Sequence, residues 1–283
     1  FAIQKCELKD IHTFWDTIFC LAAFMTSGYA QNTFVFKTKR SEVILLSEGQ
    51  FSNKKDVLIG LEKEMLDKSD TTALFKTALN AFLVKTRNGK NILVDTGLGR
   101  ELFNNLAWAG VSPDMIDIVL ITHLHGDHYR VLVKENKKTF PNAKIYISKE
   151  EYPSADENAK RVLKHYDNDL VLFEPGVDKP EIVCEKIKAW YITGHTPGHT
   201  VYQVDNLLIW GDVTHAMDYQ MTFPQVAIVY DTNAKKAVEN RKKLFDYIVK
   251  NNLTAAGMHI PYPAFGKVSV LSDGSYKFTP VKH

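Results

Sequence analysis

The sequence predicts an α/β (α+β) fold in which two mixed β-sheets pack face to face and helices cover their outer sides. Short apolar segments of strand length alternate with amphipathic segments of helix length in both halves of the chain, which is typical of layered sheets and helices. Several expected strands end directly before a histidine or an aspartate. No internal repeat with a period of roughly 20 to 50 residues is evident, so one large domain is favoured over a repeat array.

The first expected elements are a β-hairpin and a buried strand. Residues 80–86 and 91–95 are apolar segments joined by a short polar turn, and Asn88-Gly89 within that turn is a strong hairpin signal. Residues 117–122 form a nearly continuous apolar run. Such a run is typical of a strand that is buried on both faces of its sheet.

The rest of the chain is expected to add four strands and two covering helices. The helices carry apolar residues at roughly helical spacing, so one face of each can pack against a sheet. The expected strands cover residues 143–148, 186–193, 207–210 and 253–258, and the expected helices cover residues 156–166 and 233–250.

Residues 1–30 predict a secretory signal peptide. The apolar run at 18–25 is too short for a membrane span, which needs about 20 residues, and small residues precede a possible cleavage site after Ala30. Cleavage there would leave one domain, residues 31–283, in a periplasmic or secreted protein without a stable membrane span. The alternative is an N-terminal helix buried in the core, since acidic residues accompany the lysines of the first segment.

Composition argues against a nucleic-acid-binding protein. The formal net charge is +2, and the lysine-rich stretches at 134–138 and 235–243 are interrupted by apolar or acidic residues, whereas nucleic-acid binders concentrate basic residues on one surface. We therefore expect a small-molecule substrate and no nucleic acid as partner. Cys184 alone follows the expected cleavage site, and we interpret it as a small residue packed in a strand.

The densest group of reactive side chains follows the strand expected at 117–122. His123, His125, Asp127 and His128 lie within six residues of one another, and neutral imidazole and carboxylate are standard ligands for zinc-like ions. The two histidines that are two residues apart in an extended segment can point the same way and share one ion. The next two ligands can turn toward a second ion, because Gly126 permits the bend.

Other candidate residues stand at the ends of later strands. His195, Asp212 and His259 each follow an expected strand directly or after one glycine. Asp95 closes the second strand of the hairpin, and we interpret it as a carboxylate that orients a ligand histidine; the alternative is an aspartate that caps its own turn. His215, three residues after Asp212, is a candidate substrate contact, or else a surface histidine.

The His-x-His-x-Asp-His motif after a strand resembles the signature of the metallo-β-lactamase superfamily. The similarity continues through segments that occur in the order found in that family, and it implies a four-layer αβ/βα sandwich, in agreement with the strands expected from the residues alone. The segments are 94–97, 193–199, 210–212 and 257–263.

The resemblance implies two divalent metal ions held by seven side chains. The first ion would be bound by His123, His125 and His195, the second by Asp127, His128 and His259, and both by Asp212 together with a hydroxide. Asp127 and Asp212 are also the candidate catalytic carboxylates. Zinc is the expected metal, with manganese, cobalt or iron as alternatives. In the segment that contains both His195 and His199, the first is favoured as the ligand because it lies directly at the strand end.

The implied activity is hydrolysis, in which the bridging hydroxide attacks a lactone, ester or phosphotriester. Segments of the C-terminal half resemble the methyl parathion hydrolase branch, to which acyl-homoserine lactonases are similar. The alternatives are a mononuclear iron persulfide dioxygenase or other redox member of the fold, and an RNA-processing nuclease, which charge and export disfavour. A homodimer is a candidate assembly.

Two further expectations concern the substrate pocket. Tyr129 and Arg130 stand where relatives commonly have a glycine pair, and they are expected to add bulk near the metals. Five aromatic residues are candidates for an apolar pocket wall or for the core, namely Phe75, Trp108, Phe223, Tyr262 and Phe265.

Overall fold

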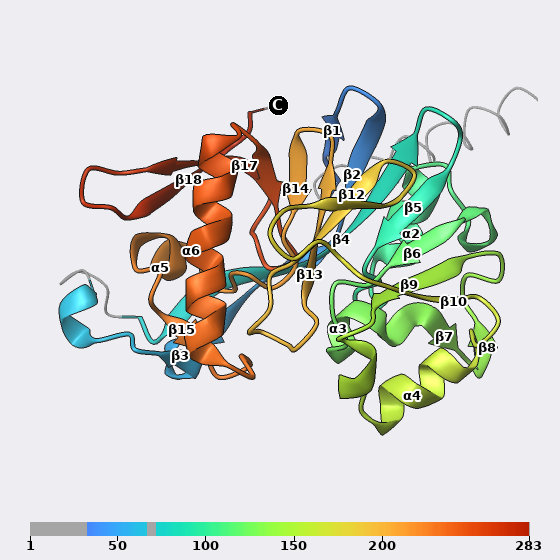
Figure 1. Ribbon diagram of the computed structural model, residues 1–283, viewed down its shortest axis with the longest axis horizontal. Coiled ribbons are helices and arrows are strands. Elements are labelled where there is room, and N and C mark those ends of the chain that lie inside the picture. The colour runs from blue at the N-terminus through green and yellow to red at the C-terminus, as the bar shows by residue number, and fades with distance from the viewer. Residues whose placement is uncertain (1–32, 67–71, 283) are drawn as a thin grey trace, which may run out of the picture.

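The computed structural model describes residues 33–66 and 72–282. The predicted signal peptide at 1–30 therefore lies outside the described residues. Two seven-stranded sheets pack face to face, and helices cover their outer sides (Figure 1). This arrangement confirms the predicted four-layer fold.

The first sheet combines an antiparallel and a parallel part. Its strands, in spatial order, are β1 (Val35–Lys37), β2 (Ser41–Lys54), β4 (Leu74–Thr86), β5 (Asn91–Val94), β6 (Ile118–Leu120), β9 (Lys144–Ser148) and β10 (Leu170–Phe173). The strands from β5 to β10 pair in parallel and the others antiparallel. The helices on this side are α2 (Leu102–Trp108), α3 (Gly126–Tyr129) and α4 (Glu157–Lys164).

The second sheet is antiparallel except where β14 pairs with β16. Its order is β11 (Glu181–Cys184), β12 (Ile187–Tyr191), β13 (Thr200–Val204), β14 (Leu207–Ile209), β16 (Thr254–Ala256), β17 (Phe265–Val270) and β18 (Tyr276–Pro280). On its outer side lie α5 (Met217–Thr222) and α6 (Ala234–Lys250).

Two short strand pairs and five 3-10 turns complete the described elements. The pairs are β3 (Leu58–Ile59) with β15 (Ala227–Ile228), and β7 (Val133–Lys134) with β8 (Lys137–Lys138). The turns are Lys55–Val57, Lys63–Met65, Pro113–Met115, Arg130–Leu132 and Tyr152–Ser154.

The apolar run predicted at 117–122 is buried on both faces because two cores meet at the first sheet. On β6, Ile118 and Leu120 face the core between the two sheets, whereas Val119 faces the core between the sheet and its helices. The neighbouring β5 repeats the pattern. Burial on both faces removes the polar residues that alternate along a half-exposed strand, which explains the continuous run.

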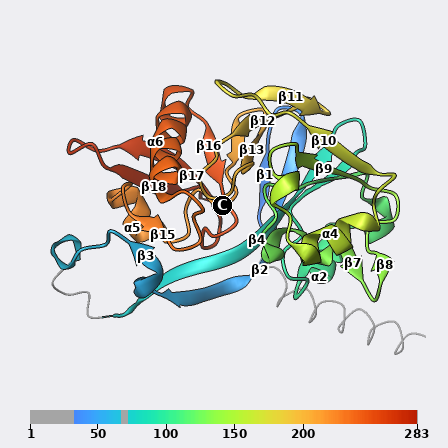
Figure 2. The same ribbon diagram turned by 60° about the horizontal axis from the view of Figure 1, so that its bottom comes forward.

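The long strands β2 and β4 extend beyond the first sheet. Figure 2 shows them running as a two-stranded ribbon toward β3 and β15. Their pairing continues from Ser41 opposite Thr86 to Lys54 opposite Leu74, with an irregularity between Ser47 and Gln50. The hairpin prediction captured only the end of β4 nearest the turn, since the outer ribbon lacks a simple alternation of apolar and polar residues.

Arg241 on α6 ties the loops after β14 to the helix. It is 1% exposed, and its guanidinium donates to Val213 O, Pro224 O and Val226 O at 2.7, 3.0 and 2.6 Å. Burial lowers the pKa of Arg241 to about 10, so the side chain stays protonated at neutral pH. A buried cation bound by carbonyl oxygens holds the backbone in one arrangement.

We expect Arg241→Met to lower the free energy of unfolding by about 3 kcal/mol or more, because three buried carbonyl groups lose their bond to the guanidinium and, among the described residues, only Val226 O keeps another donor, Gln220 Nε2. Urea denaturation followed by circular dichroism measures this change. Lys242→Met, at the exposed neighbouring position, is the matched control and should unfold close to the unmodified protein. Equal midpoints for the two variants would contradict the role given to Arg241.

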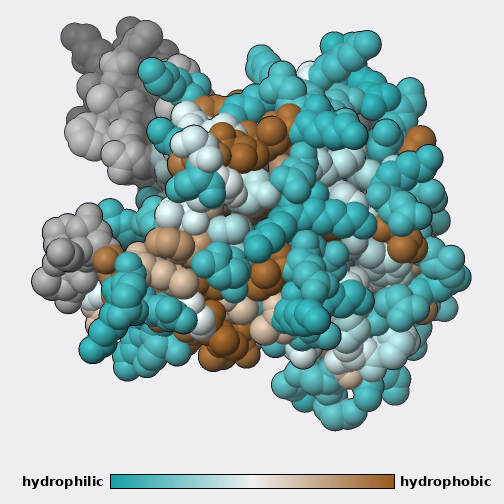
Figure 3. All heavy atoms as spheres, turned by 60° about the vertical axis from the view of Figure 1, so that its left-hand side comes forward, coloured by the Kyte–Doolittle hydropathy of each residue, from teal (hydrophilic) through white to brown (hydrophobic). Residues whose placement is uncertain are grey.

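The surface is mixed in character. On the face that carries α5 and β18, apolar side chains gather in separate patches among polar ones (Figure 3). Within the described ranges, no helix combines the length and apolar character needed to cross a membrane.

Candidate metal centre

The segment after β6 brings four polar side chains to the edge of the first sheet. His123 and His125 follow the strand in extended backbone, and α3 begins at Gly126 and carries Asp127 and His128. The change from extended to helical backbone turns the second pair away from the first. The local bend expected at the glycine is therefore present.

The second sheet contributes three more side chains from the ends of its strands. His195 follows β12, Asp212 follows β14 and His259 follows β16. The residue before His195 must be a glycine: Gly194 has a φ of +120°, and a Cβ there would lie 2.2 Å from the backbone nitrogen of Ala237. Helix α6 thus packs directly against the backbone that presents His195.

All seven side chains predicted as ligands converge between the two sheets. The ligand atoms of His123, His125, His195 and Asp212 lie within 4.8 Å of one another, and so do those of Asp127, His128 and His259. Asp212 lies between the two groups. Its Oδ2 atom is 3.2 Å from His259 Nε2, 3.3 Å from His128 Nε2, 3.4 Å from His195 Nε2 and 3.6 Å from His123 Nε2.

The chemistry of this centre fits metal ions. His123 Nε2, His128 Nε2 and Asp212 Oδ1 are buried, and none has a hydrogen-bond partner among the described residues. A buried polar atom without a partner costs roughly 1–3 kcal/mol, and a cation among these atoms would satisfy them. Imidazole nitrogen with carboxylate oxygen is a donor set that suits zinc and similar ions.

Outer hydrogen bonds fix the direction of the ligand imidazoles. Nδ1 of His128 donates to Asp95 Oδ2 at 2.7 Å, and Asp95 also accepts bonds from the Thr122 amide and hydroxyl at 2.8 and 2.7 Å. Nδ1 of His259 donates to Ala78 O at 2.8 Å. Each bond leaves Nε2 facing the centre. Asp95 thus faces His128, as expected, and does more than cap its own turn.

Asp231 plays the same part for His195, although it was not among the predicted site residues. Its Oδ1 atom lies 2.9 Å from His195 Nδ1, while its Oδ2 atom accepts the amide of Ile228 at 3.1 Å. The residue stands in a loop after a two-residue strand. A short irregular segment of this kind carries no periodic signal that would have marked it.

His199 lies behind the ligands. Its Nδ1 atom is 3.0 Å from Ile192 O, and its Nε2 atom accepts the backbone N–H of Asp212 at 3.0 Å. Burial, reinforced by the charge on His195, lowers the pKa of His199 to about 3. The ring is therefore neutral at ordinary pH and orients the Asp212 backbone.

The buried carboxylates and imidazoles of the centre shift one another's pKa values. Burial opposes ionisation, yet His128 and His259 hold the pKa of Asp212 well below its usual range. Burial also disfavours a charged His195, but hydrogen bonds to Asp212 and Asp231 raise the pKa of His195 to about 9. A fixed carboxylate surrounded by imidazoles is the arrangement expected where cations bind.

A pocket of about 260 Å³ opens onto these side chains. Its outer wall includes two cross-strand pairs from the β2–β4 ribbon, Phe51 with Thr77 and Asn53 with Phe75. Tyr230 also lines the pocket, where its hydroxyl accepts a hydrogen bond from Asn53 Nδ2 at 3.5 Å. The floor is formed by Asp127, Asp212, His215 and His259.

His215 is a buried pocket residue, not a surface histidine. Its Nε2 atom lies 3.1 Å from Asp212 Oδ2, and its ring stacks on that of His259 with centroids 4.5 Å apart. Nδ1 has no hydrogen-bond partner among the described residues. His215 also belongs to a third possible cation group with Asp212 and His259.

Residues 76–247, more than half of the chain, match the family model for the metallo-beta-lactamase superfamily. The chain belongs to the metallo-beta-lactamase superfamily. Over 210 residues, 62% of the chain, it is 26% identical to cleavage and polyadenylation specificity factor subunit 3-I of Arabidopsis thaliana, of which it covers 30%. The chain spans 15 to 41% of the length of the curated relatives it matches.

Solved structures in this superfamily resemble the whole described fold. The hydrolase AbOPH superposes with a TM-score of 0.77 and 26% identity, covering 89% of this chain and 98% of its own. AidC, described as a dizinc quorum-quenching lactonase in complex with a product, gives a TM-score of 0.74 at 24% identity, covering 89% of this chain and 99% of its own.

In this superfamily member, most of the aromatic residues proposed for the pocket lie elsewhere. Phe75 lines it, but Trp108 is exposed on α2 and Phe265 is in the core between the sheets. Phe223 packs in the small cluster beside β3 and β15. Tyr262 lines a separate pocket. Aromatic residues are usually core residues, and sequence position alone could not separate the two roles.

The expectation that Tyr129 and Arg130 add bulk beside the ligands is wrong. Tyr129 is buried in the core under the helices of the first sheet, where its hydroxyl lies 3.4 Å from Asp156 Oδ1. Arg130 is exposed. Both line a polar pocket beside α4 instead. The helical turn of α3 points the residues after His128 away from the metal centre.

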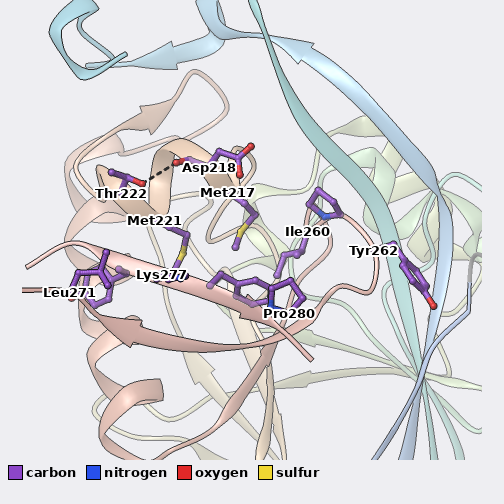
Figure 4. A pocket seen from close by; sticks show the side chains of 12 residues that line it. Met217, Asp218, Met221, Thr222, Ile260, Tyr262, Leu271, Lys277 and Pro280 are labelled. Atoms are coloured by element: carbon purple, nitrogen blue, oxygen red, sulfur yellow. Dashed lines mark hydrogen bonds between the residues drawn. The ribbon is translucent and has the colours of Figure 1, made fainter. Parts of the chain in front are cut away.

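A larger pocket, of about 570 Å³, lies between α5, β18 and the segment after His259. In Figure 4, Met217, Met221 and Ile260 point into it, and Thr222 forms a hydrogen bond to the Asp218 backbone at 3.2 Å. None of the seven predicted ligands lines this pocket. It is separate from the candidate metal centre.

Proposed function

We propose that this superfamily member is a dinuclear metal-dependent hydrolase that cleaves a lactone, an ester or a phosphotriester. The observation that carries the proposal is the convergence of seven side chains, five of them buried, among which His123 Nε2, His128 Nε2 and Asp212 Oδ1 have no hydrogen-bond partner among the described residues. Membership of a hydrolase fold supports the reaction type. The pocket beside the ligands, with its partly apolar wall, supports a small uncharged substrate over a polymer.

The ligand assignment follows the two groups seen in the structure. We assign His123, His125 and His195 to one ion, Asp127, His128 and His259 to the other, and Asp212 to both. Two divalent ions, with zinc best suited to these donors, would supply Lewis acidity and a water molecule of lowered pKa.

The chain's own residues would then orient the substrate. Phe51 and Phe75 exclude water from one side of the pocket, and the ring of His215 also lines it, although its Nδ1 atom is buried. Burial lowers the pKa of His215 to about 4, so its ring is neutral at ordinary pH and adds no charge to the pocket. Asp127, whose side chain is 31% exposed, can hold or release a proton beside the leaving group.

We expect His215→Ala to lower kcat/KM by about 10- to 100-fold, or about 1.4–2.7 kcal/mol, because the ring that lines the pocket and packs against Asp212 and His259 is lost. The bound metal should remain at the unmodified level, because His215 lies outside the assigned ligand set. Steady-state kinetics and elemental analysis of the same preparation provide the two measurements. Loss of one equivalent of metal would instead make His215 a ligand, as its cluster with Asp212 and His259 allows.

Metal analysis paired with a substrate panel tests the proposed function. We expect two equivalents of a divalent metal, hydrolysis of at least one class among lactones, aryl esters and phosphotriesters, and complete loss after chelation with recovery on adding metal. A single iron with sulfur-dependent oxygen uptake and no hydrolysis would favour the persulfide dioxygenase alternative.

The RNA-processing alternative is supported by the partial identity to a cleavage and polyadenylation factor subunit. The near-neutral net charge of +2 argues against it. Single-stranded RNA is therefore included in the panel, and metal-dependent cleavage of RNA without hydrolysis of the small substrates would favour the nuclease. Periplasmic or secreted localisation and a homodimer remain proposals.

A further inference from the structure

Glu151 is a buried carboxylate outside the assigned ligand set. It follows β9, is 1% exposed and forms no salt bridge within the described ranges. Burying a carboxylate is costly unless hydrogen bonds compensate it. Its Oε1 atom accepts the Leu124 amide at 2.8 Å, and its Oε2 atom accepts the Thr196 hydroxyl at 2.7 Å and the Gly198 amide at 2.9 Å.

The three donors belong to the two loops that carry the first-ion histidines. Leu124 stands between His123 and His125, and Thr196 directly follows His195. One loop follows β6 in the first sheet and the other follows β12 in the second. The carboxylate of Glu151 therefore links the two sources of ligands for one ion.

Close backbone packing supports the same conclusion. A Cβ on Gly198 would lie 2.1 Å from the backbone nitrogen of Glu151, so the loop after β12 lies directly against the turn after β9. Ser148 Oγ also donates to Gly198 O at 2.8 Å. With the backbones in contact, the position of the carboxylate relative to both loops is fixed.

We propose that Glu151 is a positioning residue that sets the spacing of His123, His125 and His195, and with it the metal affinity of the first site alone. This inference rests on the dinuclear centre proposed above. The second-ion ligands have other supports, because His128 is held by Asp95 and His259 by Ala78 O. Loss of Glu151 should thus weaken one site and spare the other.

Glu151→Gln keeps the shape of the side chain but replaces one carboxylate oxygen with an NH₂ group, which cannot accept a hydrogen bond. The variant therefore loses its bond either to the Leu124 amide or to the donors of the loop that contains Thr196. Cadmium NMR of the full chain at increasing cadmium concentration measures each site separately. His195→Ala and His259→Ala identify which resonance belongs to which ion. We expect the first-site affinity to fall by about 10- to 100-fold, with the second within a few-fold of the unmodified protein.

Glu150→Gln, at the exposed neighbouring position, is the matched control and should leave both resonances and the activity unchanged. If Glu151→Gln does not fold by circular dichroism, Thr196→Val removes one of the three bonds with a side chain of similar shape, and a smaller loss confined to the first site is expected.

The cadmium measurements distinguish failure of the proposed dinuclear centre from failure of the role proposed for Glu151. If the unmodified protein binds a single cadmium ion, the dinuclear centre itself is wrong. If it binds two and the variants weaken both sites equally, or neither, Glu151 does not act as a positioning residue. A general loss of stability would lower both affinities together, and the comparison between sites separates that effect from selective positioning.

Discussion

Asp212→Ala is expected to abolish turnover, with kcat reduced by about 10³-fold or more. Asp212 is the one predicted ligand whose carboxylate lies within 3.6 Å of histidines from both groups. Its removal takes away the negative charge that would offset the two cations of the proposed centre and leaves the buried imidazoles to repel one another. We also expect the metal content to fall below one equivalent.

Kinetics and elemental analysis on the same samples measure both effects. Asp178→Ala, at an exposed position, is the matched control and should retain full activity and metal. An Asp212→Ala protein that still turned over at the original rate would show that this carboxylate was assigned the wrong role.

The second large effect is expected from Asp95→Asn. Asp95 is fully buried and receives Nδ1–H of His128 at 2.7 Å. An asparagine amide can donate to Nδ1, which would move the imidazole proton to Nε2, the atom that faces the centre. We expect the affinity of the second site for metal to fall by about 10- to 100-fold.

Competition with a chelator of known affinity measures that change. Asp95→Asn should lose one ion well before the other, and excess zinc should restore much of the activity. Asn88→Asp replaces an amide by a carboxylate in the exposed hairpin turn, away from the metal centre. It serves as the control. Simultaneous release of both ions at the unmodified chelator concentration would contradict the tautomer argument.

The fold could be predicted because the burial of a strand determines which of its residues must be apolar. Strands such as β6, packed between two cores, must be apolar along their whole length. The candidate ligands could be predicted because they stand at the ends of those strands, where a polar side chain can leave the sheet. The hairpin was readable from Asn88-Gly89, whose geometry requires a glycine at positive φ, and Gly89 has a φ of +84°.

What escaped prediction depends on contacts between distant segments. Asp231 and Glu151 act through hydrogen bonds to loops 27 to 47 positions away, and no local pattern marks such bonds. Most of the pocket wall escaped for a related reason, although Phe75 was among the predicted candidates. Phe51 and Phe75 become neighbours of the ligands only because the β2–β4 ribbon extends past the sheet, whereas Trp108 and Phe265 look equally suitable in the sequence.

The β2–β4 ribbon carries part of the wall of the proposed substrate pocket but none of the candidate metal ligands. Its inner length is anchored in the core of the first sheet, its outer end supplies Phe51, Asn53, Phe75 and Thr77, and none of the seven predicted ligands belongs to it. Thr77 Oγ1 donates to the carbonyl of the candidate ligand His259 at 3.3 Å, so substitutions at Phe51, Asn53 and Phe75 are expected to change the pocket wall with less effect on the candidate ligands. In the proposed hydrolase, such substitutions would alter which substrate is accepted while the reaction stays the same.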